Sequence, residues 1–276
     1  MNKIKLDKFK QDIARVDDRR QSSYDKGEVG NWHYNIARRL VECADLQLGD
    51  KVLDLATGTG MVALEAAKKV GASGKVIGVD IASGLLEVAR QKIDEANLNS
   101  NVILQLADVE ALSFAENSFD CILCCSALSL FTDVSNDLLL WHDFLVPEGK
   151  LGLCVFAKTA FVHGVVLQKI ARRYGVNLPM NDLTGTPAKC HSLLQAAGYK
   201  DIKITTEQYG SYITLESSAS KSWNTSFEHP HCSPLLNLPS KQLEQLRVEY
   251  INELEALVTE RGIWNDITTY FVVAKK

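Results

Sequence analysis

The sequence predicts an α/β protein with a seven-stranded, mostly parallel sheet, an antiparallel edge strand and helical cap insertions. Short apolar runs alternate with segments of helical periodicity over residues 51–156, which is typical of parallel strands joined by helices. These runs contain few polar residues, as expected for strands that are covered on both faces. The last helical segment leads into one final apolar run without a full-length crossover, which favours an antiparallel strand at the edge.

The first half of the chain contains most of the expected sheet. Residues 31–44 place apolar side chains on one helical face and predict an N-terminal helix. Further along, strands are expected at 51–56, 75–81, 101–108, 119–128 and 150–156, and helices at 61–71 and 83–98. Pro147, Glu148 and Gly149 predict a turn directly before the fifth of these strands.

After residue 156 the alternation becomes less regular. The expected elements there are helices at 163–175, 186–198 and 240–262 and strands at 200–209 and 266–276. Pro187 near one helix start, and Gly198 and Gly262 after two helix ends, agree with the usual preferences at helix termini. We expect one domain over 1–276, with a helical lid at 1–44, a core at 45–156, 186–209 and 266–276, and cap insertions at 157–185 and 210–262.

Composition narrows the class of protein. The chain has 276 residues, of which 46% are hydrophobic and 23% charged, as in ordinary globular proteins. A net charge of −4 gives no basic footprint for a nucleic-acid partner. No apolar run approaches the roughly 18 residues of a membrane span, and the charged N-terminus lacks the apolar core of a secretory signal. Seven cysteines, an odd number that lies mostly within apolar runs, predict a reduced, cytoplasmic protein with buried thiols; its oligomeric state is left open.

The stretch VLDLATGTG supports two interpretations. Gly58, Gly60 and Ala63 fit the dinucleotide pattern GxGxx[GA], which would indicate NAD. Asp54 and Ala56, together with the two glycines, fit the turn of an enzyme that uses S-adenosylmethionine (SAM). In either case small residues at the end of a strand would let the backbone and a helix N-terminus approach a ligand.

Carboxylates at three strand ends favour SAM. Asp80 ends the second strand and can accept hydrogen bonds from ribose hydroxyls in either cofactor. Asp54 would be unfavourable beside a pyrophosphate but suits the ammonium and sulfonium of SAM; alternatively, it caps the neighbouring turn. Asp108 could accept from the exocyclic amine of adenine, with Val109 as an apolar neighbour under the ring.

Four blocks resemble the class I SAM-dependent methyltransferases, whose fold is Rossmann-like. They are VLDLATGTG, VIGVDIASGLLEVAR, LADVEALSFAENSFDCI and FLVPEGKLGL, and they occur in that family's order and spacing. Within the family the chain looks most like the ubiquinone/menaquinone C-methyltransferase (UbiE-type) group. The resemblance covers roughly residues 45–156, and residues 157–270 carry no assignable block.

The resemblance implies a set of cofactor-binding residues. Ala56, Gly58 and Gly60 would contact the methionine part of SAM, Asp80 and Ile81 the ribose, and Asp108 and Val109 the adenine. Ser126 would border the transferred methyl group, and Tyr24 would close over the cofactor. The chain departs from the family in having Ala56 for the usual first glycine and Pro-Glu-Gly for Pro-Gly-Gly. Neither change alters the expected chemistry.

Methyl transfer from a sulfonium is an in-line displacement, and positioning alone can supply roughly 7–11 kcal/mol. A base is needed only when the acceptor must lose a proton. His163 is the candidate base, with packing as the alternative; His33 borders the lid. Trp223, Phe227 and other aromatics either line an acceptor pocket or form core.

The expected function is therefore SAM-dependent methyl transfer to a small, fairly apolar organic acceptor, on O, N or C. An NAD-dependent oxidoreductase and a non-catalytic SAM-binding protein are the alternatives. No metal is expected, because Cys121 and Cys124 of the CILCC run would point to opposite faces of a strand.

Overall fold

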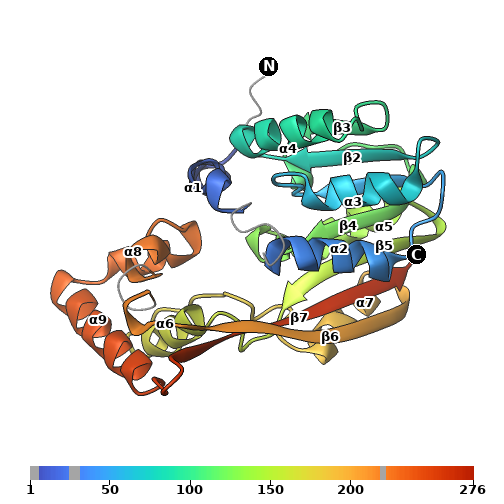
Figure 1. Ribbon diagram of the computed structural model, residues 1–276. Helices are drawn as coiled ribbons and strands as arrows, with labels where there is room; N and C mark the ends of the chain where they lie inside the picture. Colours follow the sequence, from blue (N-terminus) through green and yellow to red (C-terminus); the bar gives the residue numbers. More distant parts are fainter. Residues whose placement is uncertain (1–5, 25–31, 218–221) are drawn as a thin grey trace. The chain divides into compact units, whose positions relative to one another are not determined.

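The computed structural model describes residues 6–24, 32–217 and 222–276, without the side chains of 21–24 and 222 (Figure 1). The chain divides into two compact units. Unit 1 comprises the described residues of Met1–Val155, Pro187–Thr205 and Tyr270–Lys276, and unit 2 comprises those of Phe156–Thr186 and Thr206–Thr269. These bounds lie close to those of the two expected insertions; the single-domain organisation stays a prediction.

In the described residues the sheet has seven strands in the order β3-β2-β1-β4-β5-β7-β6. The strands are β1 Lys51–Leu55, β2 Lys75–Asp80, β3 Val102–Leu106, β4 Phe119–Cys125, β5 Leu145–Phe156, β6 Lys200–Ile213 and β7 Ile263–Lys275. The pairs β1–β2, β1–β4, β2–β3 and β4–β5 are parallel. The strand order reverses between β1 and β4, which is where open α/β sheets bind their ligands.

The antiparallel strand is β7. Ala157 N donates to Thr268 O at 2.9 Å and Lys276 N donates to Gly149 O at 2.9 Å, so residue numbers rise along β5 as they fall along β7. The predicted fold class is confirmed, with β7 one place in from the outermost strand β6. Both β6 and β7 continue from unit 1 into unit 2.

Helices cover both faces of the sheet in unit 1. Its helices are α1 Lys8–Tyr24, α2 Trp32–Ala44, α3 Met61–Val70, α4 Ser83–Glu95, α5 Val134–Phe144 and α7 Pro187–Ala196. Figure 1 shows α2, α3 and α4 along one face. Gly152 of β5 faces α2, because a Cβ there would lie 3.4 Å from Leu40. Successive residues of a strand point to opposite faces, so Leu151 and Leu153 point to the other face of the sheet. They are 0% and 2% exposed, so that face is covered as well.

Two expected boundaries differ most from the structure. β5 begins at Leu145 rather than at 150, because the Pro-Glu-Gly stretch forms an irregularity within the strand instead of a turn before it. Glu148 takes the left-handed conformation there, with φ 64°, where a glycine would be less strained. The helix expected at 240–262 ends at Glu255, and Thr259 then pairs with Gly262 in a bridge that leads into β7.

Unit 2 has its own apolar core. Its helices are α6 Val162–Arg173, α8 Ser222–Ser226 and α9 Ser240–Glu255. Trp223 packs against Tyr250 and Phe227, with ring centroids 5.4 Å and 4.9 Å away. Of the aromatic residues considered for a pocket, Trp223 therefore belongs to this core. Within the described part of the chain, no helix combines the length and apolarity needed to span a membrane.

Candidate functional site

The turn after β1 is built from residues with positive φ. Ala56, Gly58 and Gly60 have φ of 52°, 56° and 79°, and α3 begins at the next residue, Met61. A Cβ on Gly60 would lie 3.0 Å from Ala89 Cβ, so glycine permits this close approach. A Cβ on Gly58 would meet nothing within 4 Å. Gly58 therefore faces open space, as a residue that approaches a ligand should.

Asp80 connects this turn to the end of β2. Its Oδ2 accepts from Gly58 N at 2.8 Å, and its Oδ1 accepts from Ala82 N at 2.8 Å. The side chain is 5% exposed, and burial raises the pKa of Asp80 to about 6 despite these backbone hydrogen bonds. Asp80 thus fixes the turn from the neighbouring strand.

Asp54 lies behind the turn. It is fully buried, and its Oδ2 accepts from Thr57 Oγ1 at 2.5 Å. Its Oδ1 has no hydrogen-bond partner within the described structure. Burial raises the pKa of Asp54 to about 7. The contact with Thr57 matches the alternative in which Asp54 caps the turn, and its contact with a cofactor stays a prediction.

The raised pKa of Asp54 makes the free energy of unfolding depend on pH. Between about pH 4 and 7, Asp54 keeps a proton in the folded protein that it has lost in the unfolded chain. The contribution of protonated Asp54 to the free energy of unfolding is therefore fully present below pH 4 and is lost as pH rises through about 7. For the protein without ligands, we expect Asp54→Asn to reduce the fall in stability between pH 5 and 8 by roughly 2 kcal/mol. Urea unfolding at both pH values measures this slope; an unchanged slope in the variant would show that Asp54 titrates normally.

Two hollows in unit 1 meet at the turn. The first, of about 50 Å³, is lined by Asp108 and Val109 beyond β3, and we call it the β3-side hollow. The second, of about 140 Å³, is lined by Cys125 and Ser126 beyond β4, and we call it the β4-side hollow. Both are lined by Ala56, by Asp80 and by Asp17 of α1. A ligand in both would therefore extend past the turn, along the carboxyl ends of the parallel strands.

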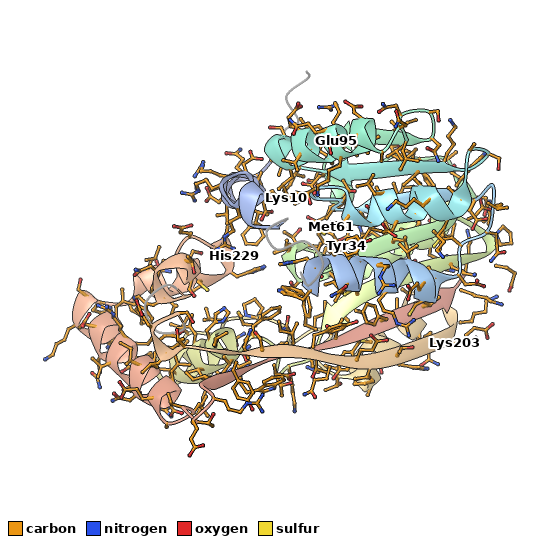
Figure 2. All side chains as sticks on the ribbon, in the orientation of Figure 1. Lys10, Tyr34, Met61, Glu95, Lys203 and His229 are labelled. Carbon is orange, nitrogen blue, oxygen red and sulfur yellow. The ribbon has the colours of Figure 1, made fainter. Side chains whose placement is uncertain are left out.

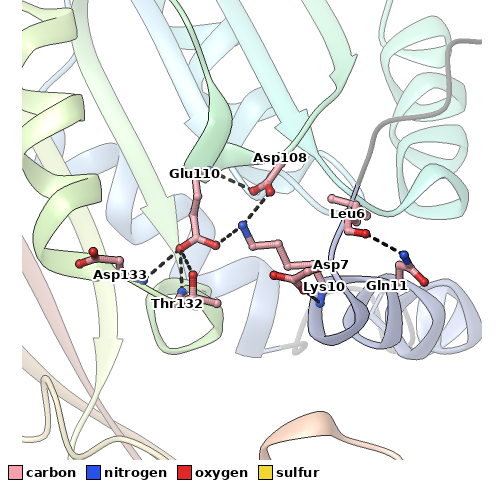
Figure 3. Close-up of polar contacts among 8 residues, drawn as sticks. All are labelled: Leu6, Asp7, Lys10, Gln11, Asp108, Glu110, Thr132 and Asp133. Carbon is pink, nitrogen blue, oxygen red and sulfur yellow. Dashed lines mark hydrogen bonds and ion pairs between the residues drawn. The ribbon is translucent and has the colours of Figure 1, made fainter.

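The β3-side hollow contains a salt-bridge cluster (Figure 3). Lys10 Nζ of α1 donates to Asp108 Oδ2 at 2.7 Å and also pairs with Glu110. Asp108 Oδ1 accepts from Glu110 N at 3.0 Å. Glu110 Oε1 accepts from Thr132 N and Oγ1, both at 2.7 Å, and from Asp133 N at 3.0 Å. The cluster thus ties α1 to the segments that follow β3 and β4.

The structure brings most of the predicted site residues together. The hollows are lined by Ala56, Gly58, Asp80, Ile81, Asp108, Val109 and Ser126. Gly60 belongs to the turn but packs against Ala89. Tyr24 ends α1, and its side chain lies outside the described residues. His163 lies in unit 2, in the first turn of α6 beside Phe161, and its role as a base stays a prediction.

Sequence reasoning missed the contribution of α1. Lys10, Ile13 and Asp17 of this helix line the β3-side hollow, and Figure 2 labels Lys10 there. The signal was present, because Phe9, Ile13 and Val16 repeat at helical spacing. On α2, His33 and Ile36 line the β4-side hollow.

Other parts of the molecule are less suited to a ligand. A hollow of about 380 Å³ in unit 1 is lined by Lys150, Lys203 and Lys275 (Lys203 is labelled in Figure 2), but Lys150 lies opposite Cys121 near the amino end of β4, and Lys203 lies near the start of β6. Lys150 Nζ donates to Ala44 O at 3.0 Å, and Lys275 pairs with Glu148 at 3.1 Å. Among the described residues, no group of three or more His, Cys, Asp and Glu could hold a metal ion.

Comparison with known proteins finds similarities to the part of the chain that contains the turn. Residues 52–149 match the family described as "Methyltransferase domain". The ubiquinone/menaquinone biosynthesis C-methyltransferase UbiE of Cronobacter sakazakii is 37% identical over 124 residues, which are 45% of this chain and 49% of that enzyme. The chain spans about half the length of the curated relatives that it matches.

Solved structures extend the likeness to the whole fold. Phosphoethanolamine N-methyltransferase 2 of Haemonchus contortus, in complex with phosphomonomethylethanolamine and S-adenosylhomocysteine, aligns with a TM-score of 0.63 at 16% identity, covering 98% of this chain and 60% of that one. The cyclase SpnF aligns with a TM-score of 0.57 at 16% identity, covering 91% and 84%. At such identities these structures show the fold alone.

Proposed function

We propose that this chain, whose residues 52–149 match a methyltransferase domain, is a class I enzyme that transfers the SAM methyl group to a small, fairly apolar organic acceptor. One observation carries the proposal: the open side of Gly58 lies at a turn that Asp80 holds from the next strand. The methionine part of a cofactor could approach Gly58 closely, because a Cβ at this position would have no protein atom within 4 Å.

The described residues fit such a cofactor along both hollows. Asp80, which lines both, would accept hydrogen bonds from the ribose hydroxyls beside Ile81, and Val109 would flank the adenine. Gly58 and Ser126 in the β4-side hollow would lie toward the methionine part and the methyl group. Asp54, whose pKa burial raises to about 7, would become a carboxylate behind the turn when it loses its proton, and a cation bound in front of the turn would favour that charged form.

SAM, when bound, would supply an electrophilic methyl group on a good leaving group. The protein's own task would be to hold the acceptor in line with it and to exclude water. The β4-side hollow offers apolar walls for this purpose from Ile36, Val62 and Leu85. This supports an apolar acceptor, as does the similarity to C-methyltransferases of ubiquinone and menaquinone biosynthesis.

Isothermal titration with S-adenosylhomocysteine (SAH) tests the cofactor, and NADH is the matched control ligand. We expect saturable binding of SAH with a Kd in the micromolar range and no binding of NADH. Binding of NADH alone would instead support an oxidoreductase and would contradict the proposal.

Mass spectrometry then tests for a reaction. With labelled SAM and a library of phenols, quinones, amines and enolisable carbonyl compounds, we expect a methylated product from an apolar member. SAH binding without turnover on any acceptor class would indicate a non-catalytic SAM-binding protein.

A further inference from the structure

The helix α1 is anchored to unit 1 at three places. Near its start, Lys10 pairs with Asp108 and Glu110. In its middle, Ile13 and Val16 are 4% and 2% exposed. Further on, Asp18 Oδ1 accepts from Gly84 N at 2.7 Å, at the start of α4. The contact of α1 with the rest of unit 1 is therefore specific rather than a loose apolar covering.

Lys10 is the cationic component of this contact. Its side chain is 13% exposed, as is that of Asp108, and that of Glu110 is 9% exposed. Burial would lower the pKa of Lys10, but the hydrogen bonds to Asp108 and Glu110 outweigh it and raise the pKa. Burial would raise the pKa of Glu110, yet its bonds with Lys10 and Thr132 lower it. Lys10 thus places one positive charge between two carboxylates that would otherwise repel each other.

The pairing also determines how Asp108 is oriented. A carboxylate has about four lone-pair positions, and Asp108 uses two of them, on Lys10 and on Glu110 N. Two positions remain to accept from a ligand in the β3-side hollow, which Lys10 and Asp108 both line. Glu110 Oε1 is occupied by Thr132 and Asp133, so it is not equally available.

We propose that Lys10 is a positioning residue for the cofactor: it holds α1 as a wall of the β3-side hollow and orients Asp108 to accept from the adenine amine. This inference rests on the proposed function, because it assigns the adenine to that hollow. The sequence predicted that adenine is recognised only by residues at the ends of the strands, whereas this inference adds a cation from the N-terminal helix.

The test compares Lys10→Met with Lys8→Met. Lys8 lies on the same helix, but its side chain is exposed and pairs only with Asp12 in the described structure. Isothermal titration measures binding of SAH and of S-inosylhomocysteine, in which a carbonyl replaces the adenine amine. Circular dichroism verifies that each variant is folded.

We expect the wild type and Lys8→Met to bind SAH at least tenfold more tightly than the inosine analogue. Lys10→Met should bind SAH about tenfold more weakly and lose most of this discrimination, because Asp108 is no longer held in place. Lys10→Arg should restore the discrimination, since its guanidinium can pair with both carboxylates.

Two outcomes would overturn the inference while leaving the proposed function intact. In one, Lys10→Met keeps wild-type affinity and discrimination. In the other, it loses both ligands by the same factor, which would indicate a purely structural role. If the wild-type protein itself binds no SAH, the proposed function fails, and this inference fails with it.

Discussion

Replacing Gly58 with valine is expected to abolish SAH binding while leaving the protein folded. The Cβ of residue 58 would point into space that contains no protein atom within 4 Å, so the larger side chain would occupy the position of the cofactor. The positive φ of 56° adds strain, which costs about 1–2 kcal/mol for a residue with a Cβ. Isothermal titration should therefore show no heat of binding, and circular dichroism should show native secondary structure.

Gly175→Val is the matched control for this substitution. Gly175 also has positive φ, at 74°, and its Cβ would likewise meet nothing within 4 Å, but it lies in unit 2 and lines neither hollow. It should carry similar strain and retain SAH binding. If Gly58→Val binds SAH as the wild type does, the turn does not face the cofactor.

Removing the Asp80 carboxylate should have the second largest effect. We expect Asp80→Ala to weaken SAH binding at least tenfold, because both the ribose acceptor and the hydrogen bond to Gly58 N are lost. Asp120→Ala is the control, since its Oδ2 accepts from Lys51 N at 2.8 Å at the amino end of β4, away from the hollows. Equal affinity in Asp80→Ala and the wild type would contradict the ribose assignment.

The same residue predicts how binding depends on pH. Burial raises the pKa of Asp80 to about 6, and only the carboxylate accepts hydrogen bonds on both oxygens. SAH affinity should therefore be highest above about pH 7 and fall as pH decreases through 6. In Asp80→Ala this decline should be absent.

The fold was predictable because the spacing of apolar residues along the sequence reflects which side chains become buried. Val52, Leu53 and Leu55 are fully buried in β1, and such continuously apolar strands indicate a sheet covered on both faces. The place of β7 within the sheet was not predictable, because a pattern of burial does not determine which strands become neighbours. The end of α9 was missed because a hairpin turn formed by Thr259 and Gly262 competes with the helix.

The site was predictable where residues share one strand end. Gly58 lies in the turn after β1 and Asp80 ends the adjacent strand β2, and local sequence determines where each strand ends. The pairing of Lys10 with Asp108 could not be predicted from local sequence. The two residues are 98 positions apart, and they meet only because α1 packs against this part of the sheet. Asp54 shows a similar limit: its spacing suits a cation, but side-chain geometry directs one oxygen toward Thr57.

The most direct test of the central claim is a crystal structure of the protein grown with SAH. We expect the nucleoside to lie across both hollows, with its ribose hydroxyls on Asp80, its adenine beside Val109, and its homocysteine backbone against Gly58. Density for SAH elsewhere, or hollows without it at a saturating concentration, would contradict the account.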